Sequence, residues 1–431
     1  MTAHAHQSAL SLQQLAPNLV VKVREGDLAK AQLALLAIGA GLVGAAWLAV
    51  GGKSFYFAYL VGYMGVLGIC LGALFFTMVQ HITRAGWSVV VRRIAENIAG
   101  ALPAMALLFI PVLVGSHDLY HHWMEPKPGD EVLAGKSAWL NSTFFFVRAA
   151  IYFAIWIGLA AFFRSQSIKQ DETGDPAISL RLSRVAAPGL LLFALSTTFA
   201  AFDWIMSLDP HWFSTIFGIT YFSGGVMAFF AFTILLTRWL GSRGYLAGAS
   251  GNAMSTEHFH DLGKLLFAFM VFWTYTNFSQ YMLIWYANLP EETAWYEHRA
   301  HNGWSAIGTL LIAGHFFFPF AFLMSRHVKR NPLGLAFGAT FMLIIHCIDM
   351  QYLILPNMGH GEHAAPAGEA AHGGFGHAFG EYLHTIGWAD FGCYVGLLSL
   401  LVGIALMNVR RANLVPVRDP RLAESLRFQN I

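Results

Sequence analysis

Charged side chains are scarce in this sequence, and their scarcity excludes most soluble proteins. Asp, Glu, Lys and Arg make up 12% of the 431 residues, whereas hydrophobic residues make up 56% and the mean hydropathy is +0.52. A soluble domain carries about 25% charged residues. The net charge of +2 gives no sign of a nucleic-acid partner, and we expect none, because the positions of these few charges matter more than their sum.

Cysteine is also scarce, which excludes several redox and metal sites. Cys70, Cys347 and Cys393 lie singly within apolar stretches. They offer neither a disulfide framework nor the clustered spacing of a zinc or iron–sulfur site. The sequence has no CxxCH motif for haem attachment, no cofactor motif and no nucleophile–base pair. We therefore expect this chain to hold no metal and no cofactor of its own, and not to be catalytic alone.

Long apolar stretches dominate the sequence instead. Each has about 20 residues or more, enough for a helix rising about 1.5 Å per residue to cross about 30 Å of hydrocarbon. The ten stretches lie near residues 28–50, 55–80, 95–115, 140–163, 185–208, 214–240, 261–287, 303–325, 332–356 and 386–408. They predict an all-α integral membrane protein, in which a domain of ten transmembrane helices at 28–408 lies between tails at 1–27 and 409–431.

Basic residues fall almost entirely on one side of the predicted helices. Of the 26 Lys and Arg residues, 20 lie on the two tails or on the connections that share their side. The opposite side holds Lys53, Lys127, Lys136 and Arg299. By the positive-inside rule, both termini are predicted to be cytoplasmic. The outward connections are then 115–139, 209–213, 288–302 and 357–385.

The longest outward connection, 357–385, is rich in Gly, Ala and His and contains no Lys or Arg. Five of its residues are of a type that binds metal ions, namely His360, His363, His372, His377 and His384. Their irregular spacing among glycines favours a polar loop over a metal site.

A faint internal repeat links the fifth and ninth predicted helices. Each ends with an Asp that is followed seven residues later by a Pro, as Asp203 is by Pro210 and Asp349 by Pro356. Both helices run from inside to outside, so the two carboxyl groups are expected at similar depth in the outer half of the membrane. Two successive four-helix bundles, helices 2–5 and helices 6–9, flanked by helices 1 and 10, would produce this spacing. Coincidence is the alternative, because only two polar positions match.

Ionisable residues inside the predicted helices are the candidates for function, because such groups are costly in hydrocarbon and usually face a partner or a polar path. Those in the middle or outer half are Arg148, Asp203, His315, His346, Asp349 and Asp390. We interpret them as a candidate proton path in which Asp and His gain and lose protons. His346 and Asp349, three residues apart, share one helix face. For Arg148 and Asp203 the alternative is a structural ion pair that locks adjacent helices.

Two further interpretations stay open for the same residues. His315 and His346, on neighbouring helices, could ligate a b-type haem, although the phenylalanines at 316–318 are expected to crowd a porphyrin. Midplane Asp, His and Arg could instead form the substrate or ion site of a secondary transporter. Transporters usually have matched midplane breaks, whereas Pro188 and Pro319 are expected to interrupt helices nearer the inner side.

The tightest predicted outward turn lies within segment 202–215, which reads FDWIMSLDPHWFST. Asp209 and Pro210 are expected to end one helix, and Ser214 or Thr215 to cap the next by accepting a backbone N–H bond. In a chain of ten predicted helices with both tails cytoplasmic, this sequence resembles the NrfD/PsrC-like membrane subunits of quinol:cytochrome c oxidoreductases. The F-type subunits of bacterial alternative complex III are the nearest match we can name, with the C-type paralogues as rivals. The resemblance spans about residues 28–408, but its specificity rests mainly on this segment.

The resemblance implies a multi-pass subunit of a respiratory complex in the bacterial inner membrane. Members of this family are two four-helix bundles flanked by one helix at each end, and they hold no metal. It implies as partners a paralogous ten-helix subunit and outer-face subunits that carry haem c and iron–sulfur clusters, besides membrane lipid. C-type members hold the quinol site, whereas F-type members contribute structure and are associated with a proton path. Whether this chain binds quinol therefore stays open, and a secondary transporter remains the alternative function.

Overall fold

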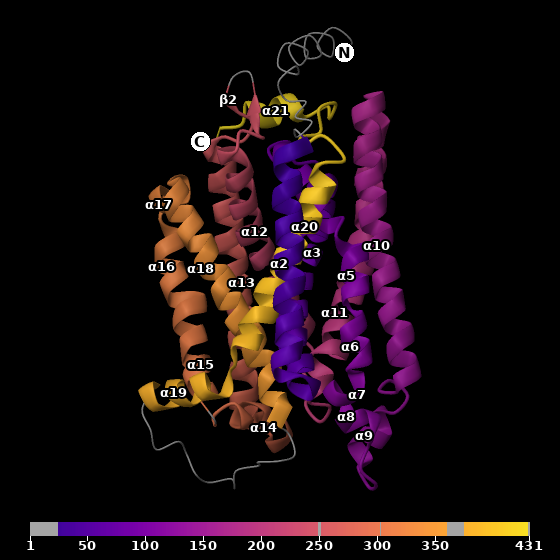
Figure 1. Ribbon diagram of the computed structural model, residues 1–431, viewed down its shortest axis with the longest axis vertical. Helices are drawn as coiled ribbons and strands as arrows, with labels where there is room; N and C mark the ends of the chain where they lie inside the picture. The colour runs from indigo at the N-terminus through magenta and orange to yellow at the C-terminus, as the bar shows by residue number, and fades with distance from the viewer. Residues whose placement is uncertain (1–24, 249–250, 302, 360–374, 430–431) are drawn as a thin grey trace.

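The computed structural model describes residues 25–248, 251–301, 303–359 and 375–429 (Figure 1). Within them the regular structure is helical, apart from a short antiparallel hairpin of β1 (Ala247–Gly248) and β2 (Gly251–Asn252). Nine of the helical runs described are long and apolar enough to cross a membrane. The prediction of an all-α, multi-pass membrane protein is therefore confirmed. The tail at 1–24 and the histidines of segment 360–374 lie outside the described residues.

Five of the nine runs lie in the first half of the chain. They are α2 (Glu25–Val50), α3 (Gly52–Ile82), the interrupted run of α4 (Val89–Ala99), α5 (Leu102–Leu108) and α6 (Ile110–Val114), then α10 (Ser142–Thr173) and α11 (Pro176–Trp204). The connection before α10 contains α7 (Ser116–Leu119), α8 (His121–Met124) and α9 (Glu131–Lys136). Asn141 begins α10 by accepting the Phe144 N–H, and Gly174 ends it at φ 69°. Pro188 lies inside α11 without dividing it, so the expected interruption there is wrong.

The other four runs lie in the second half. They are α12 (Phe217–Ser242), the run of α15 (Trp304–Leu311), the π-helical η3 (Ile312–Phe317) and α16 (Phe318–Met324), then α18 (Pro332–Ile354) with η4 (Leu355–Gly359), and α20 (Trp388–Val409). Shorter elements are η2 (Met206–Leu208), α14 (Pro290–His298), α17 (Arg326–Arg330), α19 (Phe375–Thr385) and α21 (Leu422–Leu426). The expected loop at 357–385 is therefore partly helical, at η4 and α19.

One long helix, α13 (Thr256–Ala287), matches the seventh predicted span but is not among the nine apolar runs. It contains 32 residues, which would extend about 48 Å. Its C-terminal half is rich in polar side chains, namely Thr274, Thr276, Asn277, Ser279 and Gln280. These residues lower its hydropathy without shortening it.

The helices α3 and α12 form the centre of the bundle. α3 is buried along nearly its whole length and packs against α12, α20, α11, α4 and α18. A Cβ atom added to Gly225 of α12 would lie 3.0 Å from the Gly68 Cα, so glycine permits this close approach. At the periphery, α2 packs on α20, where a Cβ on Gly39 would lie 2.6 Å from the Gly396 carbonyl oxygen. Small residues of this kind let membrane helices pack closely.

The start of α2 and the segment after α20 lie at the same end of the bundle, here called the termini end (Figure 1). The segment after α20 packs against the helices rather than leaving them. The Ser425 hydroxyl donates to the Trp87 carbonyl oxygen over 2.6 Å, and Arg418 Nη1 donates to the Glu172 carbonyl oxygen over 2.5 Å. The described part of the predicted C-terminal tail thus belongs to the folded body.

A buried network of charges stabilises the termini end. Arg93 contacts Glu96 Oε2 over 3.0 Å and Asp171 Oδ2 over 2.9 Å. Arg92 contacts Glu96 Oε1 over 3.5 Å and also pairs with Asp419 in the C-terminal segment. All five side chains are at most 8% exposed. The network joins α4, α10 and the C-terminal segment. Because each charge has an opposite partner, no charge in it is buried alone, which would be strongly destabilising.

Candidate functional site

The first cluster of predicted site residues is an ion pair between α10 and α11. Arg148 Nε donates to Asp203 Oδ2 over 2.7 Å, and Arg148 Nη2 donates to Asp203 Oδ1 over 2.9 Å. Trp139 Nε1 and the Tyr152 hydroxyl also donate to this carboxylate, over 2.9 and 2.8 Å. The guanidinium group lies 4.3 Å from the Trp139 ring centre and 4.4 Å from that of Phe144.

This geometry favours a structural role for Asp203. Arg148 and Asp203 are 3% and 1% exposed, and the carboxylate accepts four hydrogen bonds. A bidentate Arg–carboxylate pair fixes geometry as well as charge. The third guanidinium nitrogen, Nη1, donates to the Trp139 carbonyl oxygen over 2.8 Å, so the pair also ties down the start of α10.

The second cluster lies around Trp273 of α13. The Trp273 indole stacks on the His315 imidazole, with ring centroids 3.4 Å apart and planes inclined by 15°. Its Nε1 donates to Asp349 Oδ2 over 3.1 Å. His346, on the same face of α18 as Asp349, shares a neighbour with Trp273: a Cβ atom added to Gly224 of α12 would be 3.6 Å from His346 Cε1 and 3.3 Å from Trp273 Cδ1. Three of the six predicted site residues therefore gather around one indole ring.

Both imidazoles of the Trp273 cluster have unused hydrogen-bonding capacity. His315 and His346 are 0% exposed, and within the described residues none of their ring nitrogens makes a hydrogen bond of normal geometry, although the Gly65 backbone lies close enough to interact with His346. Buried polar atoms are normally satisfied by protein groups or by ordered water. His315 lies in the π-helical turn η3, and such turns often occur at functional positions in helices. Asp349, 3% exposed, forms no ion pair with any described residue.

The two Asp-to-Pro segments have parallel contacts at the end of the bundle opposite the termini. The Pro210 carbonyl oxygen accepts a hydrogen bond from Lys136 Nζ over 2.6 Å. The Pro356 carbonyl oxygen lies 2.9 Å from His298 Nε2. Lys136 and His298 precede α10 and α15, which are the third helices of the two proposed four-helix units. A sequence repeat would produce such contacts.

Asp390 belongs to neither cluster. It is the third residue of α20, and its Oδ2 accepts the Gly387 N–H over 2.8 Å. A carboxylate at this position caps the start of a helix and interacts favourably with the positive end of the helix dipole. Among the described residues no hydrogen bond joins the Arg148–Asp203 pair to the Trp273 cluster. The six candidates thus occupy three separate places.

Sequence reasoning missed two residues: Trp273, which organises the second cluster, and Arg299, which is buried at the end of the bundle opposite the termini. Trp273 carried no signal, because a tryptophan in an apolar helix is ordinary. Arg299 donates to the carbonyl oxygens of Trp295, Tyr352 and Leu353 over 3.1 Å each, and stacks 3.5 Å from the Trp295 ring centre. Burial lowers the pKa of Arg299 to about 10. The sequence did single Arg299 out, because it is the only Lys or Arg between residues 288 and 302.

The turn at 209–213 differs from its prediction at the start of α12. This helix begins at Phe217 with no side-chain cap. The Ser214 hydroxyl instead donates to Gln280 Oε1 of α13 over 2.9 Å. The capping prediction is therefore wrong, because a buried polar side chain on α13 offers Ser214 a tertiary partner.

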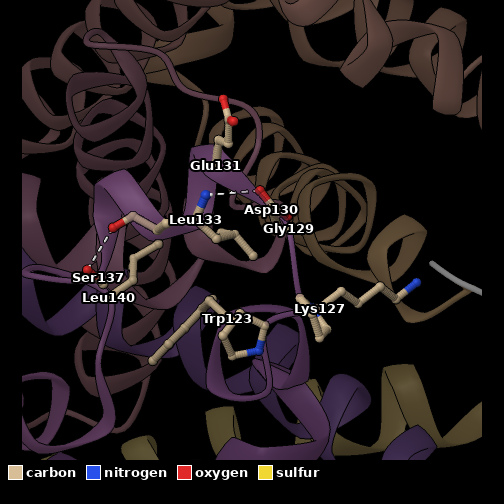
Figure 2. A pocket seen from close by; sticks show the side chains of 11 residues that line it. Trp123, Lys127, Gly129, Asp130, Glu131, Leu133, Ser137 and Leu140 are labelled. Atoms are coloured by element: carbon tan, nitrogen blue, oxygen red, sulfur yellow. Dashed lines mark hydrogen bonds between the residues drawn. The ribbon is translucent and has the colours of Figure 1, made fainter.

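A pocket of about 340 Å³ opens at the end opposite the termini, around α8 and α9 (Figure 2). Trp123, Lys127 and Asp130 are among its lining residues. Asp130 accepts the Leu133 N–H over 3.0 Å and lies 2.7 Å from His211 Nε2, and these hydrogen bonds lower the pKa of Asp130. None of the six predicted site residues lines this pocket, so it is separate from both clusters.

A haem between His315 and His346 does not fit this arrangement. Trp273 packs on the face of His315 and, at Gly224, beside His346, so the indole occupies space that a porphyrin would need. Of the three phenylalanines expected to crowd a porphyrin, Phe317 and Phe318 are 63% and 41% exposed, and only Phe316 is half-buried. The described part of the chain also contains no group of three or more His, Cys, Asp or Glu residues placed to hold a metal ion.

No protein-family model matches the chain, and no curated protein matches it. The function of the chain is therefore inferred from its own residues. The Trp273 cluster is the arrangement best suited to chemistry, since it places a carboxyl group and two imidazoles in the protein interior.

Proposed function

We propose that the chain crosses the membrane ten times, with α13 as the additional span. Its 32 residues are long enough, and its polar contacts through Trp273 and Gln280 face other helices rather than lipid. In this arrangement α3 to α11 and α12 to α18 form the two four-helix bundles, and α2 and α20 flank them. The distribution of Lys and Arg places both termini in the cytoplasm.

We further propose that the protein is a membrane subunit of a respiratory quinol:cytochrome c oxidoreductase in the bacterial inner membrane, and that it conducts protons. The sequence of segment 202–215, which resembles that of NrfD/PsrC-like subunits, supports the assignment to this type of complex. The proton role rests on one observation: the Trp273 indole contacts both the Asp349 carboxyl group and the fully buried His315 ring, and the equally buried His346 lies three residues before Asp349 on α18. The chain anchors partners that carry haem c and iron–sulfur clusters, because electron transfer needs centres that its own residues do not supply.

The residues of the Trp273 cluster have distinct parts in this proposal. The Asp349 carboxyl group gains and loses a proton, and the Trp273 N–H holds one of its oxygens in place. His346 and His315 each carry two ring nitrogens, so either ring can accept a proton on one side and release one on the other. Asp203 holds α10 and α11 together through Arg148 and has a structural part.

Gentle solubilisation followed by identification of co-purifying proteins tests the assignment to a complex. We expect a multihaem cytochrome c, an iron–sulfur subunit and a second ten-helix subunit to co-purify. Isolated from them, the chain should lack haem absorbance in a reduced-minus-oxidised spectrum. A lone monodisperse chain would overturn the assignment.

The Asp349→Asn substitution tests the proton role, because Asn keeps the shape and hydrogen bonding of the carboxylate but cannot carry a proton. In the assembled complex we expect quinol-driven turnover or proton release to fall by about tenfold or more. Asp390→Asn is the matched control, since it neutralises another buried carboxyl group, one that caps a helix. Normal proton release in Asp349→Asn, with normal assembly, would remove the proton role.

A secondary transporter is the second candidate function. Interrupted helices are a feature of transporters, and this chain has two interrupted runs. The run α4–α6 and the run α15–α16 are both broken. They are the third and eighth of the ten proposed spans, however, and these are not equivalent positions in the two four-helix bundles. Transporters place their breaks at equivalent positions. Substrate or ion uptake by the purified chain in vesicles would decide for the transporter.

A further inference from the structure

A second pocket lies at the termini end, between the last turns of α12 and the first turns of α13 and α18. Its volume is about 310 Å³. The lining residues that decide its chemistry are Ile234, Arg238, Phe259, Lys329, Arg330 and Leu335. Ile234 and Arg238 are four residues apart on α12, so they lie one turn apart on one face of the helix. The pocket is therefore apolar toward the bundle centre and basic toward the helix ends.

The positive charge of this pocket is only partly compensated. Arg330 pairs with Glu257, with contacts of 2.6 and 2.9 Å. Lys329 donates to the Met324 carbonyl oxygen over 3.2 Å, and burial and the nearby Lys264 lower its pKa. Arg238, half-buried, has no ion-pair partner among the described residues. Two of the three cations that line the pocket are thus left without an acidic partner.

The position of the pocket along the helices determines which molecules can reach it. Arg238 is four residues from the end of α12, which corresponds to about 6 Å along the helix axis. Phe259 and Leu335 lie in the first turns of α13 and α18. This is the level at which membrane helices meet lipid phosphates, so an amphiphile with a negative head group can approach with its chains already in the apolar layer.

We propose that this pocket binds the phosphate group of an anionic phospholipid. Arg238 and Lys329 contact the phosphate, and Arg330, held by Glu257, borders it. Ile234, Phe259 and Leu335 contact the glycerol and the first methylenes of the acyl chains. Basic pockets between helices on this side of a membrane are a general form of lipid-head-group site.

The test compares Arg238→Gln with Arg243→Gln in the purified full-length chain with its native partners. Arg243, five residues further on, stacks on Trp239 and does not line the pocket. Native mass spectrometry would count retained phospholipids, and titration with phosphatidylglycerol would measure affinity through the thermal unfolding midpoint. We expect Arg238→Gln to bind phosphatidylglycerol about fivefold more weakly than the unmodified chain, and Arg243→Gln to bind it equally well.

Two further arms identify the source of the phosphate and guard against misfolding. Phosphatidylcholine should not replace phosphatidylglycerol, and inorganic phosphate alone should not raise the unfolding midpoint. Equal stabilisation by inorganic phosphate would mean a soluble anion, and equal affinity in Arg238→Gln and Arg243→Gln would overturn the site altogether. If Arg238→Gln does not fold, Arg238→Lys, which keeps the charge, should retain the lipid. Loss of lipid in a folded Arg238→Lys protein would contradict a charge-based site.

Discussion

Trp273 contacts His315 and Asp349 through different parts of one indole ring. Its face stacks on the imidazole with centroids 3.4 Å apart, and its Nε1 donates to the carboxylate over 3.1 Å. The ring thereby sets the positions of two ionisable groups on two different helical runs, η3 and α18. Trp139 acts at Asp203 in a similar way but shares that carboxylate with Arg148 and Tyr152. The two buried aspartates therefore have different surroundings, one with a cation and one without.

Asp203→Asn should destabilise the protein before it affects activity. The substitution leaves the Arg148 guanidinium buried without a counter-charge, which typically costs about 3–5 kcal/mol. We expect a lower thermal unfolding midpoint and a smaller yield of assembled complex on size-exclusion chromatography.

The double variant Arg148→Gln/Asp203→Asn should recover most of this loss, because both charges are then removed. Asp118→Asn is the control, since Asp118 is an exposed carboxylate outside the spans. If the double variant were as unstable as Asp203→Asn alone, the ion pair would not be the reason for the loss.

Trp273→Phe should lower quinol-driven turnover while the complex still assembles. Phenylalanine keeps a ring beside His315 but cannot donate to Asp349, and one such hydrogen bond is worth about 1 kcal/mol, or about fivefold in rate. Steady-state turnover and proton release would be measured together. Trp285→Phe, at a position 66% exposed on the same helix, should leave both unchanged. Unaltered turnover in Trp273→Phe would show that the indole N–H does not position Asp349 for function.

The predicted orientation can be read from cysteine labelling. Lys127→Cys, on an exposed outward connection, should react with an impermeant maleimide in intact cells. Arg411→Cys, exposed at the termini end, should react only after the membrane is made permeable. The native Cys70, Cys347 and Cys393 are buried and should give little background. Labelling in the reverse order would invert the topology.

Asp419→Asn should loosen the termini end. Arg92 loses the partner on the C-terminal segment but keeps Glu96, so the expected cost is about 1–3 kcal/mol rather than that of a fully stranded charge. Limited proteolysis should then remove the segment after residue 409 more quickly. Glu424→Gln, at an exposed carboxylate of the same segment, serves as the control. Equal proteolysis of both variants would show that the Arg92–Asp419 pair does not hold the segment.

The helices were predictable from sequence because hydrocarbon imposes length and apolarity on each span. The run from 28 to 50, for example, lies within α2 (Glu25–Val50). The helix ends were less predictable where polar residues continue a helix beyond the apolar layer, as α10 does to Thr173. The start of α12 at Phe217 depended on a tertiary contact of Ser214 that a local capping rule does not contain.

The candidate site was predictable only as a set of residue types at a common depth. Helical spacing placed His346 and Asp349 on one face, and both do face the interior. Spacing could not show that His315 would meet them, because η3 is π-helical and shifts the register of its span. It also could not separate Asp203 from Asp349, since the difference between them lies in neighbours that are distant in sequence, such as Arg148 and Trp273.

The pairing of Arg92 with Asp419 joins residues that are 327 positions apart. A ribosome reads the chain from one end, so α4 is synthesised and delivered to the membrane long before its distant counter-charge exists. During that interval Glu96 balances Arg92 and Arg93, joined by Asp171 once α10 has been made. Closure of this end by the C-terminal segment is therefore among the last events in the biogenesis of the protein, because Arg92 gains its second acidic partner only when residue 419 has been made.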